Sequence, residues 1–173
     1  GYWYEGEITF CANYDSSHTG AVIDAAVTSV VAVDPVTTAT SNLGLGATAL
    51  DSLTAEAGNY NVAVGINAGT AVTTGDNNTL VGYAAGDALV GMTDNTAIGY
   101  NALTGSSAVD STVVIGSGAG AAALTAAADG TVLIGYTAGA ALTSGADNLA
   151  IGETALLTHT TGDRNIAIGN GAM

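Results

Sequence analysis

The sequence of 173 residues has almost no basic side chains: Arg164 is its one Lys or Arg, against 15 Asp and Glu, and the formal net charge is −14. Contacts to phosphate need Lys and Arg, so we expect no nucleic-acid partner. An anionic membrane surface is disfavoured for the same reason. Strong acidity with almost no Lys is typical of a protein that stays soluble at high salt or outside a cell.

Cysteine is nearly absent as well, because Cys11 stands alone and no disulfide can form within the chain. We interpret Cys11 as a small buried apolar residue, with an interchain bridge or a reactive thiol as the alternatives. Long apolar runs are missing too. The longest, 21–33, is interrupted by Asp24 and is too short to span a bilayer, so we expect no membrane insertion.

Large side chains are also scarce. Aromatic residues make up 5% of the sequence and charged residues 9%, whereas there are 25 glycines. Charged residues usually make up about a quarter of a soluble domain. A chain of this composition cannot build its core from large side chains, and it must bury many small ones in an arrangement that repeats.

A short repeat accounts for this composition. A tripeptide that ends in glycine occurs eight times, and the closing glycines lie 19, 17, 17, 17, 19, 17 and 17 residues apart. Positions are given below relative to this glycine, so that position −1 precedes it and position +1 follows it. The repeat glycines are Gly46, Gly65, Gly82, Gly99, Gly116, Gly135, Gly152 and Gly169.

Several positions of the repeat hold one residue type. Position −1 is always Leu, Val or Ile, and the β-branched Val and Ile of seven copies favour a strand. Position +3 is always Ala, which predicts a tight inner corner with room for a methyl group only. We expect the glycine to supply a bend or a backbone conformation closed to other residues.

Position −4 is Asn in six of the eight copies, with Thr112 and Thr131 in the other two. Asn can bond the backbone locally at a turn, and stacked amides can also bond the copies above and below. We therefore predict a structural ladder, with ligand binding as the alternative. Its members are Asn42, Asn61, Asn78, Asn95, Asn148 and Asn165.

The period of the repeat decides the fold class. Helical repeats run from about 33 residues upward, and β-branched residues and Gly recur here at fixed places. We predict an all-β protein, a parallel β-solenoid (β-roll) of about eight coils of 17–19 residues over residues 41–173. Each coil would hold two short strands and two turns. Residues 1–40 lack the repeat and are expected to form a β-rich N-terminal segment that caps the first coil or attaches the rod.

Position −2 is never polar, and neighbouring residues of a strand point to opposite faces. We expect the branched residues at −1 and −3 to face the inside of the coil and position −2 to face outward. An apolar stripe along a rod usually marks an interface, so this column is predicted to contact identical chains. The contact residues would be Ala63, Leu80, Ala97, Val114, Leu133, Ala150 and Ala167.

Catalytic chemistry finds little support in the sequence. His18 and His159 lie in unrelated segments, with no Cys or carboxylate spaced to complete a metal site. We expect no enzyme activity, no cofactor and no metal. One alternative remains open: stacked Asp oxygens at position −6 could bind Ca²⁺, although a solvated turn is the favoured interpretation. These residues are Asp76, Asp110, Asp129 and Asp163.

The motif Asn-x-Ala-Ile-Gly-x-x-Ala at 95–102, 148–155 and 165–172 resembles the head repeat of trimeric autotransporter adhesins. It is also similar to repeats in the fibres and whiskers of tailed bacteriophages. The resemblance covers about residues 41–173 and implies a left-handed β-roll, three chains around a threefold axis, and a role in adhesion. No heptad pattern follows, which favours a viral fibre or a piece of a longer surface protein.

These observations predict a structural fibre or adhesin protein, a rod on a virion or cell surface that mediates attachment to a host or another surface. The expected partners are the chain itself, as a homotrimer, and a host cell-surface receptor or glycan. One alternative is a virion decoration or filament protein that binds no receptor. A lesser alternative is a tailspike that degrades polysaccharide with paired carboxylates.

Overall fold

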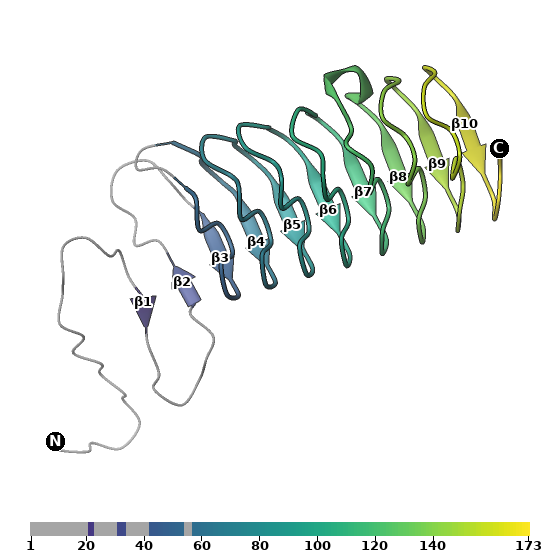
Figure 1. Cartoon of the computed structure of the whole chain (residues 1–173). Coiled ribbons are helices and arrows are strands. Elements are labelled where there is room, and N and C mark those ends of the chain that lie inside the picture. Colours follow the sequence, from purple (N-terminus) through teal and green to yellow (C-terminus); the bar gives the residue numbers. More distant parts are fainter. Residues whose placement is uncertain (1–20, 23–30, 34–41, 54–56) are drawn as a thin grey trace, which may run out of the picture.

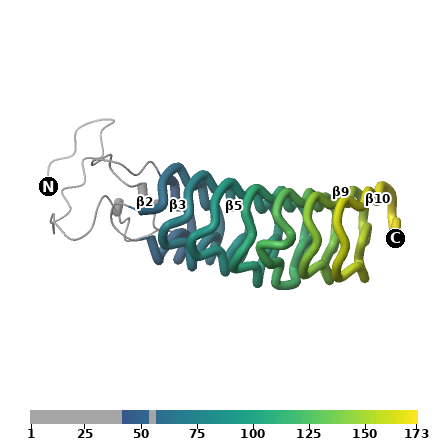
Figure 2. The backbone as a smooth tube through the Cα atoms, turned by 90° about the horizontal axis from the view of Figure 1, so that it is seen from above, coloured from purple at the N-terminus to yellow at the C-terminus, as the bar shows by residue number. Residues whose placement is uncertain are grey.

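The computed structural model describes residues 21–22, 31–33, 42–53 and 57–173. It is an all-β, parallel β-solenoid whose coils stack into a rod, which confirms the predicted fold class (Figure 1). Seen from above, the coils follow one another in chain order along the rod (Figure 2). The parallel strands are β3 (Leu43–Leu45), β4 (Val62–Val64), β5 (Thr79–Val81), β6 (Thr96–Ile98), β7 (Val113–Ile115), β8 (Val132–Ile134), β9 (Leu149–Ile151) and β10 (Ile166–Ile168).

The strands pair without any slip of register. Ala97, for example, pairs with Leu80 of the coil before and with Val114 of the coil after. The pairing holds across a 19-residue coil as well, where Val114 pairs with Leu133. The longer path of that coil includes the short 3₁₀ helix η1 (Ala126–Ala128), outside the strands. Insertions therefore enter the turns and leave the sheet unchanged.

Two short strands precede the parallel stack. β2 (Val31–Val33) pairs antiparallel with β3, and β1 (Ala21–Val22) pairs antiparallel with β2. Backbone groups at this edge of the first coil are thus occupied by a strand of opposite direction. Most of the segment expected to cap or attach the rod, including Cys11 and His18, lies outside the described residues.

The second strand expected in each coil is absent from the described part of the repeats. Each coil has one strand of three residues, and the remainder is a series of turns. The coil around Gly99 shows the cause, because Asp94, Asn101 and Leu103 have positive φ values of 60°, 52° and 55°. Such left-handed residues, spaced two apart after the glycine, reverse the chain too sharply for an extended strand.

The repeat glycines have φ between 130° and 142°, which residues with a side chain rarely adopt. They also lie against the backbone of the following coil. A Cβ atom on Gly99 would stand 2.6 Å from the carbonyl oxygen of Gly116. At Gly169, in the last coil of the chain, nothing lies within 4 Å of that point. Glycine is therefore required both by backbone conformation and by the contact between coils.

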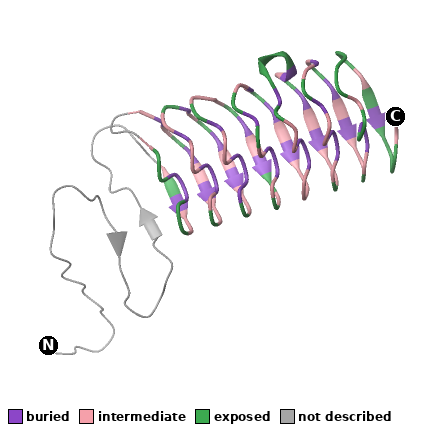
Figure 3. Ribbon diagram, viewed as in Figure 1, coloured by how far each residue is buried: buried purple, intermediate pink, exposed green. Residues whose placement is uncertain are grey.

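The residue at position −2 is the buried residue of the strand, so the prediction that this column faces outward is wrong; Figure 3 shows the burial along the ribbon. A three-residue strand directs one side chain to the inside and two to the outside, and the narrow coil admits only one column. The sequence did not reveal which face was inner, because both faces of the strand are apolar. Ala63, Leu80, Ala97, Val114, Leu133 and Ala150 are 0% exposed, and Ala167 is 2% exposed.

The core is filled by complementary volumes at positions −2 and +4. Large residues at −2 face a glycine at +4: a Cβ atom on Gly86 or on Gly139 would stand 2.7 Å from a methyl carbon of Leu80 or of Leu133. In two coils a small residue at −2 occurs with a buried Leu at +4, as Ala97 with Leu103 and Ala150 with Leu156. Ala63 occurs with Gly69 instead, and the space beside Gly69 is filled by Leu80 of the next coil. The alanines at +3 line the same interior, and Ala68, Ala85, Ala102, Ala119, Ala138 and Ala155 are 0% exposed.

Substituting Ala for two repeat glycines separates backbone strain from the contact between coils. Gly169→Ala should lower the free energy of unfolding by about 1–3 kcal/mol, because only the strained φ opposes it. Gly99→Ala should cost a further 1–3 kcal/mol or so, since the added methyl also displaces the backbone of the next coil. Urea denaturation measures both values. Equal losses would show that the coils do not touch at this column.

Candidate functional site

The predicted Asn residues lie in one buried stack. Asn95 shows the pattern: its Oδ1 accepts the N–H of Thr112 in the next coil at 3.1 Å, and its own N–H donates to Oδ1 of Asn78 at 3.1 Å. In the same way, the N–H groups of Asn61, Asn78 and Asn165 donate to the side-chain Oδ1 of Asn42, Asn61 and Asn148, respectively. The bonds thus run from Asn42 to Thr112 and again from Asn148 to Asn165.

The amide nitrogens of these Asn side chains are occupied as well. Nδ2 of Asn61 donates to the carbonyl oxygen of Gly75 at 2.7 Å, and Nδ2 of Asn95 donates to that of Val109 at 2.9 Å. Each acceptor lies 14 residues further along, in the turn that leads into the next coil. Asn61, Asn78, Asn95 and Asn148 are buried with both ends of the amide bonded, so they hold coils together and leave no group for a ligand.

The Asp residues at position −6 form a second ladder, which the sequence did not reveal. Asp110 accepts the N–H of Thr93 in the preceding coil at 2.6 Å, and Asp163 accepts that of Ala146 at 3.0 Å. Asp76 and Asp129 accept from Asn59 and Asp110 in the same manner. One carboxylate oxygen of each residue is thereby held by the backbone. In the part of the chain that the structure describes, no three His, Cys, Asp or Glu side chains gather to hold a metal ion.

The remaining groups with catalytic potential are scattered. His159 lies with Nε2 3.3 Å from the side-chain nitrogen of Asn165, not from a carboxylate. Glu153 bonds Asn170 at 3.3 Å and Asp87 bonds Thr104 at 2.8 Å, each as a link between neighbouring coils. No two of these carboxylates face each other across a shared site in the contacts of the described residues.

The outward face of the sheet is apolar along its length except at Thr79 and Thr96. It carries positions −3 and −1, whose side chains are half-buried by their neighbours in most coils. Exposure rises at the last strand, where Ile166 and Ile168 are 69% and 65% exposed. We call this surface the sheet face. It consists of Leu43, Leu45, Val62, Val64, Thr79, Val81, Thr96, Ile98, Val113, Ile115, Val132, Ile134, Leu149, Ile151, Ile166 and Ile168.

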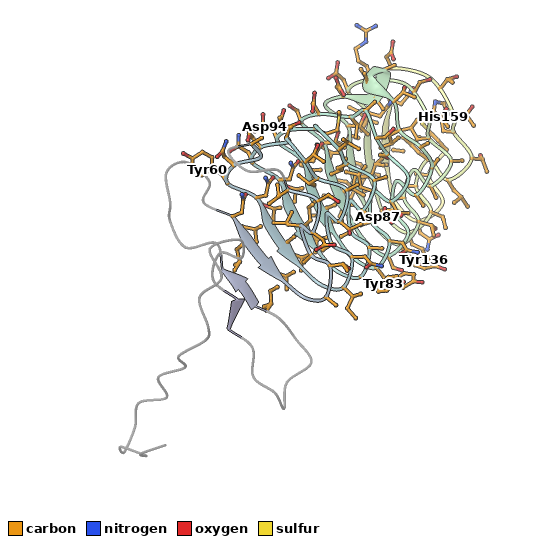
Figure 4. All side chains as sticks on the ribbon, turned by 60° about the vertical axis from the view of Figure 1, so that its left-hand side comes forward. Tyr60, Tyr83, Asp87, Asp94, Tyr136 and His159 are labelled. Atoms are coloured by element: carbon orange, nitrogen blue, oxygen red, sulfur yellow. The ribbon has the colours of Figure 1, made fainter. Side chains whose placement is uncertain are left out.

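Position +1 forms an exposed column along one edge of the sheet face, which we call the tyrosine ridge. Tyr83 and Tyr100 stack one coil apart, with ring centroids at 5.4 Å and an angle of 14° between the rings. Tyr83 and Tyr136 project from the same edge, opposite the edge that carries Tyr60 and Asp94 (Figure 4). The ridge consists of Ala47, Ile66, Tyr83, Tyr100, Ser117, Tyr136, Glu153 and Asn170.

Sequence reasoning missed both surfaces for identifiable reasons. The sequence predicts the sheet face to be interior, because its two columns hold aliphatic residues in most copies of the repeat. The ridge had a signal in the sequence, since Tyr follows the repeat glycine in three of the eight copies. Position +1 otherwise varies from Ala to Glu, which is typical of an exposed site.

Comparison with known proteins gives no relative: no protein-family model, curated protein or solved structure matches this chain. Within the described ranges, no helix is long and apolar enough to cross a membrane. The interpretation of function therefore depends on the geometry of the rod itself.

Replacing Asn95 by Leu tests the ladder. The change removes the partners of the Thr112 N–H and of the Val109 carbonyl, so the free energy of unfolding should fall by about 1–3 kcal/mol. Asn170→Leu is the control, because Asn170 lies outside the Asn ladder and is exposed on the last coil. Thermal and urea unfolding measure both variants. An Asn95→Leu protein as stable as the control would contradict the structural role of the ladder.

Proposed function

We propose that this chain is the rod of a structural fibre or adhesin on a virion or cell surface, where it mediates attachment to a host or another surface. The proposal includes no enzyme activity. The observation that carries it is the uniform stack: both polar ladders and the whole core serve to hold one coil on the next. A chain built in this way gives length and stiffness, and it leaves its outer surfaces for contact with partners.

Self-association is part of the proposal. The sheet face spans eight strands of three residues, roughly 34 Å by 10 Å, and 14 of its 16 residues are aliphatic. Exposed apolar patches of a few hundred Å² are often interaction sites. The occupant we propose is a second and third copy of the same chain around one axis, as the resemblance to trimeric adhesins implies. A left-handed coil belongs to the same resemblance.

Symmetry supports this choice of occupant. The side chains of the sheet face recur at every coil, so a copy with the same spacing between its coils can match them along the full length. Leaving the face in water would cost roughly 25 cal/mol for each Å² of apolar surface. A closed ring of identical chains buries every sheet face and leaves none to drive further aggregation.

A decoration or filament protein without receptor binding shares the same rod and the same assembly. The tyrosine ridge favours the attachment role over it, because Tyr100 and Tyr136 keep more than half of their surface in solvent, where it is free for contact with a partner. The tailspike alternative has no such support. Six of the described carboxylates act as links between coils: Asp76, Asp87, Asp110, Asp129, Glu153 and Asp163.

Two adjacent substitutions test the assembly. Ile115→Asp places a charge on the sheet face and should give a folded monomer, because three carboxylates would otherwise meet without partners. Val114→Asp places the charge inside the coil and should prevent folding instead. Light scattering gives the mass, and circular dichroism reports the fold. A wild-type chain that is a well-folded monomer at micromolar concentration would overturn the proposal.

A further inference from the structure

The tyrosine ridge is interrupted at one coil. Tyr100 and Tyr136 occupy position +1 two coils apart, and the coil between them has Ser117 at that position, followed by Gly118. The side chains of Tyr100 and Tyr136 are 57% and 58% exposed, so their rings stand in solvent. Two aromatic residues thus flank a place where a third ring would continue the column. We call this place the Ser117 gap.

The backbone fixes the width of the gap. The N–H of Gly118 donates to the carbonyl oxygen of Tyr100 at 2.9 Å, and the N–H of Thr137 donates to that of Ser117 at 3.0 Å. Two coil spacings amount to roughly 10 Å. A ring centred in the gap would lie about 5 Å from each tyrosine, within the range of stacked rings. Tyr83 and Tyr100 show such stacking one coil away, at 5.4 Å.

The width favours a puckered ring over a flat one. A flat ring also fits this spacing, as Tyr83 and Tyr100 show at 5.4 Å, but its contact with each neighbour is then an offset stack and not face to face. The chair of a pyranose is thicker, because axial C–H bonds project from both of its faces. Those C–H bonds can pack on the two tyrosine faces while the equatorial hydroxyls stay in water.

Polar groups suited to hydroxyls surround the gap. Ser117 provides a hydroxyl group, and Gly118 leaves the floor free of a side chain. Asn101 and Thr137 stand beside Gly118 at position +2, and the Asn101 side chain makes no hydrogen bond within the described chain. The net charge of −14 disfavours an anionic sugar.

We propose that the Ser117 gap binds one neutral hexopyranose unit of a surface glycan, held between Tyr100 and Tyr136. This inference rests on the proposed attachment role and names its ligand class and its site. A rod that binds single sugar units weakly gains avidity when several chains of one fibre engage the same polysaccharide.

The experiment uses the purified chain and a panel of neutral tetrasaccharides built from glucose, galactose, mannose or N-acetylglucosamine. Saturation-transfer NMR detects binding, and ring signals of labelled tyrosine locate it. At least one probe should bind the wild type and shift the signals of Tyr100 and Tyr136 but not of Tyr60. Binding to none of the probes, or shifts confined to other tyrosines, would overturn the proposal.

Ser117→Tyr is the decisive variant, because it fills the gap with a ring and continues a column that already exists. It should weaken binding by more than tenfold, as should Tyr100→Ala and Tyr136→Ala. Tyr60→Ala, on the opposite edge, is the matched control and should bind as the wild type does. Unchanged affinity in Ser117→Tyr would contradict the site even if Tyr100→Ala were poorly folded.

Light scattering on the same variants separates this site from the assembly of the rod. A change of mass in Tyr100→Ala would assign the ridge to the contact between copies and overturn the sugar site. If no sugar binds while Ile115→Asp still gives monomers, the sugar site fails and the assembled rod stands. If sugar binds but the wild type is a monomer, the sugar site stands and the assembled rod fails.

Discussion

Each coil of the rod passes within backbone contact of the next coil at the repeat glycine, and the rest of the structure depends on this close approach. A Cβ atom on Gly116 would stand 2.2 Å from the carbonyl oxygen of Gly135, so any larger residue would force the two coils apart. The separation it sets is the spacing at which strands pair. The same spacing brings Asn Oδ1 atoms within reach of the next N–H and stacks Tyr83 on Tyr100.

The close approach also explains the composition. Coils of 17 residues with a single three-residue strand enclose a narrow interior, and a large residue at one position requires a small one opposite it. Leu133 faces Gly139, whereas Ala150 occurs with Leu156. A core of this kind needs many Ala and Gly residues and almost no aromatic ones. Stability then comes from repetition, because each coil adds the same strand pairing and most coils add the same ladder bonds.

The sequence predicted the period, the parallel stack and the Asn positions, because each of these depends on identity repeated at fixed spacing. The sequence did not correctly predict which way the side chain at position −2 points. Val113, Val114 and Ile115 are all apolar, so there is no alternation of polar and apolar residues to distinguish the two faces of the strand. The prediction of a second strand in each coil was wrong, because the sequence does not show that residues such as Asn101 and Leu103 adopt the left-handed conformation. The Ser117 gap depends on which columns are exposed, and only the structure shows that.

Distances along the rod test the stacked arrangement most directly. One spin label would be placed at Ala47 and the second at Tyr100, Tyr136, Glu153 or Asn170, all of which are exposed residues at position +1. The distance between the two labels is measured by pulsed electron paramagnetic resonance. An excess of unlabelled chain ensures that only distances within one chain are observed. The account predicts a linear increase of about 4.8 Å for each additional coil between the labels. Distances that level off or scatter as coils are added would show that the repeats do not form one continuous stack.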